Sequence, residues 1–305
     1  LLRRSLLRGI SMELWTFLNP ILKIFFYVSV VGTAGTALFI FHFRKLMEKE
    51  NILFCNKVML TSSGLGIFVC IFYFFSIAGN FGGDIMSAFN FELLKLASNT
   101  TVGQVAILTI IAHTLVCCTI FTVNKVGRII LIICTIGIVL SFAMVGHSST
   151  NGYLAQLLLL IHLTCISYWL GSFIPLRQLC KYSNYKVVGD VAHKFGVYAV
   201  SYVGLLVLSG IFYSYILLGD IRNIFSTSYG IILLIKFISV NLLLLIGALN
   251  KFRYVPMIET HPEKGVGKLY SSINYEIMLT IFVLILTSLL TTSFMLPMYN
   301  STMYN

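Results

Sequence analysis

Residues 229–250 read YGIILLIKFISVNLLLLIGALN, an apolar run in which Lys236 is the one charged side chain. About 20 apolar residues is the length that an α-helix needs to cross a hydrocarbon core of roughly 30 Å. A backbone in lipid must satisfy its own hydrogen bonds, so the run is predicted to be a transmembrane helix. Similar runs follow one another along the chain, which predicts an all-α integral membrane protein, a bundle of about eight transmembrane helices. The other predicted spans are residues 18–43, 57–80, 101–123, 129–147, 153–176, 196–218 and 273–296.

The composition supports a protein that lies in lipid. Of the 305 residues, 58% are hydrophobic and only 10% are charged, whereas a soluble domain carries about 25% charged residues. The net charge of +11 comes from short loops between apolar runs, and no basic patch interleaved with aromatic residues is present. Binding to nucleic acid is therefore not expected.

The basic residues predict the orientation in the membrane. Cytoplasmic loops of membrane proteins carry an excess of lysine and arginine. The loops after the second, fourth and sixth spans hold only Lys95 and Arg222, so the loops after the odd-numbered spans are predicted to be cytoplasmic and both termini to lie outside, in the periplasm. The basic residues of the odd loops are Arg44, Lys45, Lys49, Lys57, Lys125, Arg128, Arg177, Lys181, Lys186, Lys194, Lys251, Arg253, Lys264 and Lys268.

Three histidines lie in the outward half of the predicted bundle. His147 closes the fourth span at its outer end, His162 lies about 13 Å into the fifth span, and His113 lies about 18 Å into the third, at 1.5 Å per residue. An ionisable side chain at such a depth is expected to face the bundle interior and to mark a functional site. Imidazole is a good ligand for copper and zinc. The alternative is that each histidine only forms hydrogen bonds between helices.

Sulfur side chains lie near these histidines and in the outward tail. Two cysteines each follow a histidine by one helical turn, and so share its helix face. Thiolate and thioether ligands suit Cu(I), although cysteine and methionine also serve as ordinary apolar filler. The sulfur candidates are Cys117, Cys165, Met144, Met298 and Met303.

Four further side chains are candidates for a gating or structural role. Lys236 is a cation inside a span and needs a partner or a wet cavity. Glu276 lies near the inner end of the last span, but its predicted depth does not match that of Lys236. Asn250 can supply a hydrogen bond between helices, and Trp169 lies in the fifth span.

Known enzyme signatures are missing from the sequence. It has no P-loop, no His-Glu-x-x-His and no Gly-x-Ser-x-Gly motif, so no enzymatic activity is expected. An ion would have to move through a channel, through a secondary carrier, or with the help of a partner.

An ordered series of short motifs runs from the fourth span to the last. It begins with Gly146-His147-Ser148, Ile161-His162-Leu163 and Trp169-Leu170-Gly171-Ser172, followed by Pro175. It continues through Lys236 and Asn250-Lys251 to Tyr275-Glu276. From the fourth span onward the sequence thus resembles the CopD family of copper-handling inner-membrane proteins, whose last helix opens with a glutamate. Ser172 stands where the family has a second glycine. The first three spans are similar in architecture only.

The resemblance implies a multi-pass protein of the bacterial inner membrane that takes part in copper uptake or resistance. It implies that His147 and His162 bind copper, as Cu(I) or Cu(II), and that a separate periplasmic CopC-like carrier is a partner; membrane lipid surrounds the chain. The expected organisation is an outward N-terminal segment, with Met12 as an alternative start, five spans, a CopD-like core of three spans, and an outward tail that contains methionines. The corresponding boundaries are residues 1–17, 18–192, 193–296 and 297–305.

Three functional hypotheses remain open from the sequence. The first is copper transport, in which His147 and the outer methionines receive the ion and pass it to His162 and His113. The second is a membrane haem protein or oxidoreductase with His113 and His162 as axial ligands. The third is a membrane scaffold or sensor that transports nothing.

Overall fold

The computed structural model describes the whole chain except residues 1, 123, 146–150, 221 and 294–305. The described residues form helices joined by turns, and no strand occurs among them. Within this part of the chain, eight helical segments are long and apolar enough to cross a membrane, which confirms the predicted all-α membrane bundle. These segments are Phe17–Phe43, Lys49–Gly82, Thr101–Thr119, Lys125–Ala143, Gly152–Tyr182, Tyr185–Leu218, Ser228–Thr260 and Pro262–Thr292.

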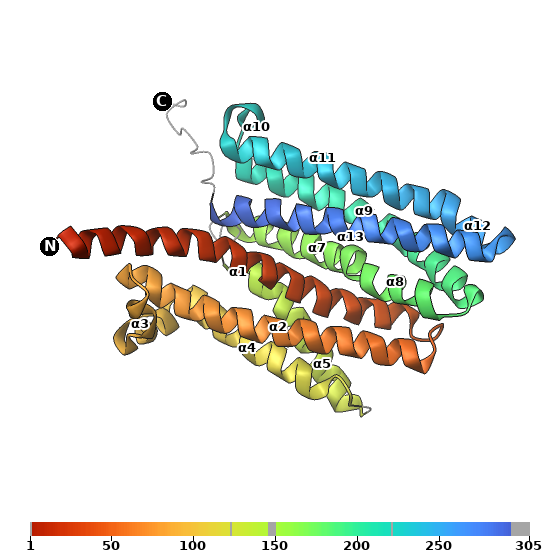
Figure 1. Cartoon of the computed structure of the whole chain (residues 1–305), viewed down its shortest axis with the longest axis horizontal. Coiled ribbons are helices and arrows are strands. Elements are labelled where there is room, and N and C mark those ends of the chain that lie inside the picture. Colours follow the sequence, from red (N-terminus) through yellow and green to blue (C-terminus); the bar gives the residue numbers. More distant parts are fainter. Residues whose placement is uncertain (1, 123, 146–150, 221, 294–305) are drawn as a thin grey trace. The chain divides into compact units, whose positions relative to one another are not determined.

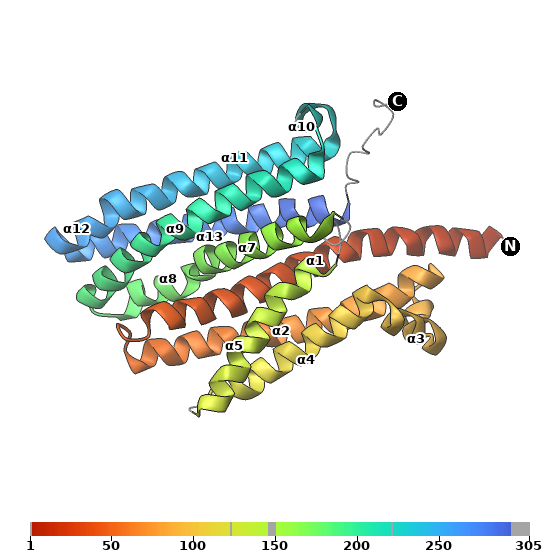
Figure 2. The same cartoon turned by 180° about the vertical axis from the view of Figure 1, so that it is seen from behind.

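The chain divides into two compact units, and each is described by itself. Unit 1 comprises Leu1–Gly146 together with Ile166–Pro175. Its long helices pack in sequence order, each against the next, and the fourth also packs against the first (Figures 1 and 2). They are α1 (Leu2–Phe43), α2 (Lys49–Gly82), α4 (Thr101–Thr119) and α5 (Lys125–Ala143).

Small residues let α1 approach its neighbours closely. A Cβ atom added to Gly35 would meet the backbone oxygen of Ser167 and would lie 2.5 Å from the Cα atom of Gly171. In the same way, a Cβ at Gly32 would meet the side chain of Ser62 on α2. Close helix crossings at small residues are the usual way in which transmembrane helices gain packing energy, because lipid supplies no hydrophobic driving force between them.

Two short helices connect α2 to α4, and the hydropathy pattern did not predict them. They are η1 (Met86–Phe89), a 3-10 turn, and α3 (Phe91–Asn99). Asn90 caps α3, because its side-chain oxygen accepts hydrogen bonds from the backbone N–H groups of Glu92 and Leu93, at 2.9 and 3.2 Å.

Several long helices also begin earlier than predicted. The start of α2 places Lys49 and Lys57 inside the helix instead of in a loop. The predicted spans 196–218 and 273–296 belong to helices that begin at Tyr185 and Pro262, so basic residues assigned to the loops before these spans also lie in helices, namely Lys186, Lys194, Lys264 and Lys268.

Unit 2 comprises His147–Cys165 and Leu176–Asn305. Its helices α9, α11 and α13 run alongside one another in both views (Figures 1 and 2), and α12 packs against α9 and α13. The elements of unit 2 are most of α7 (Gly152–Gly171) and of α8 (Phe173–Tyr182), then α9 (Tyr185–Leu218), α10 (Asn223–Ser226), α11 (Ser228–Leu249), the π-helix η2 (Asn250–Tyr254), α12 (Val255–Thr260) and α13 (Pro262–Thr292).

The fifth span is interrupted at Ser172, between α7 and α8. Pro175 has no N–H group, so the carbonyl of Gly171 loses its usual helical partner and the proline ring crowds it. The hydroxyl of Ser172 donates a hydrogen bond to the backbone oxygen of Tyr168, one turn earlier. The sequence around Trp169 therefore builds a helix break that a hydroxyl group stabilises.

Candidate functional site

His113 lies in the interior of unit 1, on α4. Its side chain is fully buried, at 0% exposure, and neither ring nitrogen has a hydrogen-bond partner among the described residues. A buried polar group without a partner is costly, so its presence in a protein interior points to a role other than packing. The imidazole therefore has two nitrogen atoms that the described part of the protein does not use.

Gly66 on α2 makes room for the His113 ring. A Cβ atom at this position would meet Nε2 of His113 and would lie 2.6 Å from its Cε1 atom. The ring is thus in contact with the backbone of α2, where only glycine leaves enough space. The sequence contained no sign of this contact, because Gly66 and His113 are on different helices.

His162 belongs to unit 2 and has one of its two ring nitrogens occupied. Nδ1 lies 3.1 Å from the backbone oxygen of Leu206 on α9, and the hydroxyl of Ser209 lies 3.5 Å from the same nitrogen. Because a carbonyl oxygen only accepts hydrogen bonds, Nδ1 must be the protonated nitrogen. In the neutral ring, Nε2 then carries the lone pair. A hydrogen bond of this kind fixes the orientation of many metal-binding histidines.

Lys236 on α11 is close enough to His162 for their charges to interact. A protonated lysine at this position disfavours positive charge on or near the imidazole ring. Two residues that the sequence analysis had singled out separately therefore lie within electrostatic range of each other in unit 2.

No group of three or more His, Cys, Asp or Glu side chains that could hold a metal ion occurs in the described ranges. Cys165 is buried and Cys117 half-buried, whereas Met144 is 48% exposed at the end of α5. His147, Met298 and Met303 lie outside the described residues.

Glu276 and Asn250 form a hydrogen-bonded pair inside unit 2. The side-chain amide of Asn250 donates to Oε2 of Glu276 at 2.8 Å. Asn250 is the first residue of η2, and Glu276 lies on α13.

Trp169 is buried in unit 1, with its ring 6.3 Å from that of Phe173 in an edge-on arrangement.

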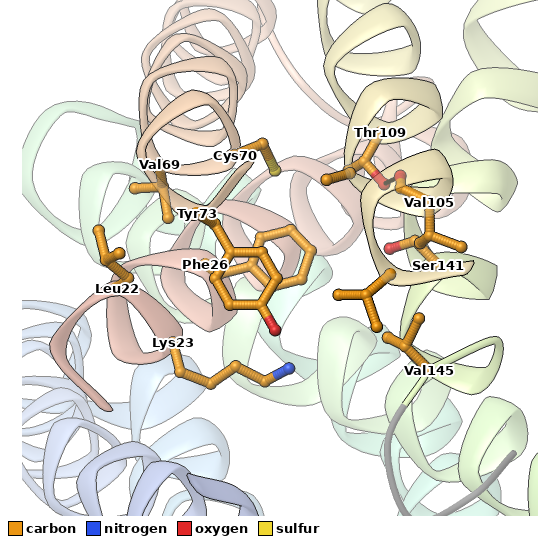
Figure 3. Close-up of a pocket in the computed structure, with 12 residues that line it drawn as sticks. Leu22, Lys23, Phe26, Val69, Cys70, Tyr73, Val105, Thr109, Ser141 and Val145 are labelled. Atoms are coloured by element: carbon orange, nitrogen blue, oxygen red, sulfur yellow. Dashed lines mark hydrogen bonds between the residues drawn. The ribbon is translucent and has the colours of Figure 1, made fainter. Parts of the chain in front are cut away.

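A small cavity in unit 1 contains a lysine that the sequence analysis did not single out. The cavity has a volume of about 30 Å3, enough for about two water molecules. Figure 3 shows the side chain of Lys23 extending along it, beside the hydroxyl of Tyr73. The cavity is lined by Leu22, Lys23, Phe26, Val69, Cys70, Tyr73, Val102, Val105, Ala106, Thr109, Ser141 and Val145.

Aromatic rings surround the ammonium group of Lys23. Its Nζ atom lies between 5.3 and 6.0 Å from the ring centres of four aromatic side chains, at the distances at which a cation is attracted by a ring face. None of the residues described as lining the cavity is acidic. A lone lysine inside an apolar span could have been found by the reasoning that identified Lys236. The four rings are Phe26, Tyr27, Tyr73 and Phe142.

Comparison with protein families gives two matches that do not overlap. Residues 12–156 match the model of the N-terminal domain of copper resistance protein D-like proteins. Residues 189–290 match the model of copper resistance protein D. The first match extends the likeness to the first three spans, where the sequence had suggested similar architecture only. A search of the curated proteins and a search of the solved structures each returned no match. With both family models matched in order along a bundle of apolar helices, the chain belongs to the CopD family of membrane proteins related to copper resistance.

Proposed function

We propose that the protein transports copper ions across the bacterial inner membrane and accepts them from the periplasmic side. The observation that carries the proposal is that two intramembrane histidines each have an imidazole nitrogen that the described protein does not use, Nε2 of His162 and either nitrogen of His113. Membership of the CopD family supports copper as the cargo. Neither family match supports the alternative of a haem protein.

The described ranges contain no multi-ligand cage, and single histidine sites of this kind suit transport better than storage. An ion passes through a protein when its binding sites are weak and successive, because a single tight cage would trap it. His162 offers one oriented nitrogen, and the nearby charge of Lys236 disfavours a second cation at the same place. The carrier would therefore hold copper briefly at His162, and in unit 1 at His113.

The outer end of the path rests on the predicted topology. His147 and the methionines of the tail, Met298 and Met303, would receive copper on the periplasmic side, where a separate CopC-like carrier would deliver it. Cys165 and Cys117, one turn from the two histidines, would provide soft ligands along the way. Lipid surrounds the apolar faces of the helices, and no enzymatic step is required.

Cellular copper content tests the proposal. Expression of the intact protein is expected to raise cell-associated copper, measured by mass spectrometry. Substituting both His147→Ala and His162→Ala should reduce this excess about tenfold or more, because even changes beyond the direct ligands of a metal typically cost that much. His193→Ala is the matched control, since His193 is exposed on α9, and its copper excess should equal that of the intact protein.

Two other results would contradict copper transport. Equal copper content with and without the protein would favour a scaffold or sensor instead. A Soret band in the purified protein that disappears in His162→Ala would assign that histidine to haem.

A further inference from the structure

Glu276 is a carboxyl group buried inside a membrane-spanning helix. Its side chain is 2% exposed, and its one hydrogen bond in the described part of the chain comes from Nδ2 of Asn250. No ion pair involves it among the described residues. A carboxylate in such a place is very costly unless a positive charge is paired with it.

The basic groups of the surrounding helices are directed elsewhere. Lys251, on η2 next to Asn250, donates from Nζ to the backbone oxygen of Gly196 at 2.9 Å. Arg177 donates to the side chains of Asn274 and Tyr270. Lys236 on α11 precedes Asn250 by about 21 Å along the helix, at 1.5 Å per residue. The remaining charged residues of α9, η2, α12 and α13 in the described chain are exposed, namely Lys186, Asp190, His193, Lys194, Arg253, Glu259, Glu263, Lys264 and Lys268.

Asn250 has one polar atom left over. Its Oδ1 is buried and has no hydrogen-bond partner among the described residues, although its Nδ2 is used by Glu276. An acceptor of this kind needs a donor, and an ionised carboxylate has none to offer. A protonated carboxyl group has one O–H donor and keeps an acceptor oxygen. A carboxylic acid and an amide can therefore satisfy each other with two hydrogen bonds, one in each direction.

We propose that Glu276 and Asn250 form a proton-binding site within the membrane. The proton sits on the carboxyl group and is donated to Oδ1 of Asn250, while Nδ2 of Asn250 donates to the other carboxyl oxygen. Release of the proton to water leaves the carboxylate and the unpaired Oδ1, which is the costly state. Protonation of Glu276 therefore determines whether Oδ1 of Asn250 has a hydrogen-bond partner.

The local backbone favours a role for this pair beyond packing. The pair involves the first residue of η2, where the helix widens into a π-turn between α11 and α12. Such turns inside longer helices occur frequently at functional sites. Loss of the proton would leave only one of the two hydrogen bonds that tie the start of this turn to α13, the one donated by Nδ2 of Asn250.

Coupling to metal ions is the functional consequence, and this step rests on the proposed function. A cation that enters unit 2 stabilises the ionised carboxylate and disfavours the proton. Binding of copper would then release a proton from Glu276. Unit 2 would thus lose a proton from Glu276 when it takes up a copper ion.

Infrared spectroscopy of the purified full chain in lipid nanodiscs tests the proton site. At neutral pH the protein is expected to show the carbonyl band of a protonated carboxylic acid, shifted in deuterated water, and Glu276→Gln should remove it. The glutamine amide can make both hydrogen bonds to Asn250, so this variant should fold. Glu263→Gln, an exposed carboxyl on the same helix, should leave the band unchanged. Asn250→Leu should move the band, because the carboxyl group loses its amide partner.

The results separate the proton site from the copper hypothesis. If the carboxylic acid band is as weak in the intact protein as in Glu276→Gln, Glu276 is ionised and the proposal is overturned. Coupling is measured with a pH indicator while Cu(I) is added: the intact protein should release protons, and Glu276→Gln should release fewer. Copper binding with equal release from both proteins would refute the coupling. If copper does not bind at all, the proposed function fails, while the infrared band still decides the proton site.

Discussion

Substitution of Gly171 by alanine is expected to destabilise unit 1 strongly. The new Cβ atom would meet the backbone oxygen of Val31 and would lie 2.6 Å from the Cα atom of Gly35. These obstructing atoms belong to the backbone, so no side chain can rotate away, and the two helices must separate. Overpacking typically costs about 1–3 kcal/mol, and we expect the upper end of that range or more here. Thermal unfolding of the purified protein and the yield of monodisperse protein measure the effect.

Gly137→Ala is the matched control for this experiment. Gly137 lies on α5 of the same unit, and a Cβ atom added there meets nothing within 4 Å. Since alanine favours a helix over glycine by about 0.5–1 kcal/mol, this variant should unfold at the same temperature as the unchanged protein or slightly above it. Equal unfolding temperatures for Gly171→Ala and Gly137→Ala would show that α1 does not cross the fifth span at Gly35.

Gly66→Ala is expected to displace His113 and to lower copper accumulation to the level of His113→Ala. The added Cβ atom would occupy the space of the imidazole ring, with Nε2, Cε1 and Cδ2 all within 2.7 Å of it. The ring must leave its position between α2 and α4, so a copper path through unit 1 would lose its histidine. Copper content of cells that express each variant at equal protein level measures the result.

A double-mutant cycle shows whether the effect acts through the ring. In a His113→Ala background the space next to Gly66 is empty, so adding Gly66→Ala should cost little more. Residues in contact typically show a coupling of about 0.5–3 kcal/mol in such cycles. Gly64→Ala, two residues away on α2, meets nothing within 4 Å and serves as the control. Additive effects of the two substitutions on the unfolding temperature would contradict the contact.

The bundle itself was predictable from hydropathy because lipid restricts the backbone so strongly. A run such as 229–250 has few alternatives to a spanning helix, since unpaired peptide groups are not tolerated in the hydrocarbon core. The starts of α2, α9 and α13 were missed, because lysines make their first turns too polar to be recognised by hydropathy. The short helix α3 was missed for another reason: its nine residues are too few to cross the membrane, and a search for apolar spans does not detect it.

Contacts between helices were beyond the reach of the sequence. The depth of His113 and His162 followed from their positions in apolar spans, but the contacts with Gly66 and with the backbone of Leu206 depend on which helix faces which. Glu276 shows the same limit. Its predicted depth indicated only that Lys236 was an unsuitable partner, whereas the amide partner Asn250 emerged from the packing of η2 against α13.

The π-turn at η2 also sets the rotational register of everything that follows it. An α-helix advances about 100° per residue, and a π-turn amounts to one residue inserted into it. Downstream, Ile258 is buried against Gly189 of α9 and Gly265 of α13. A chain shortened by one residue within η2 could still span the membrane with the same apolar residues. Its α12 would be rotated by about 100° about the helix axis, however, and Ile258 would no longer pack against Gly189 and Gly265.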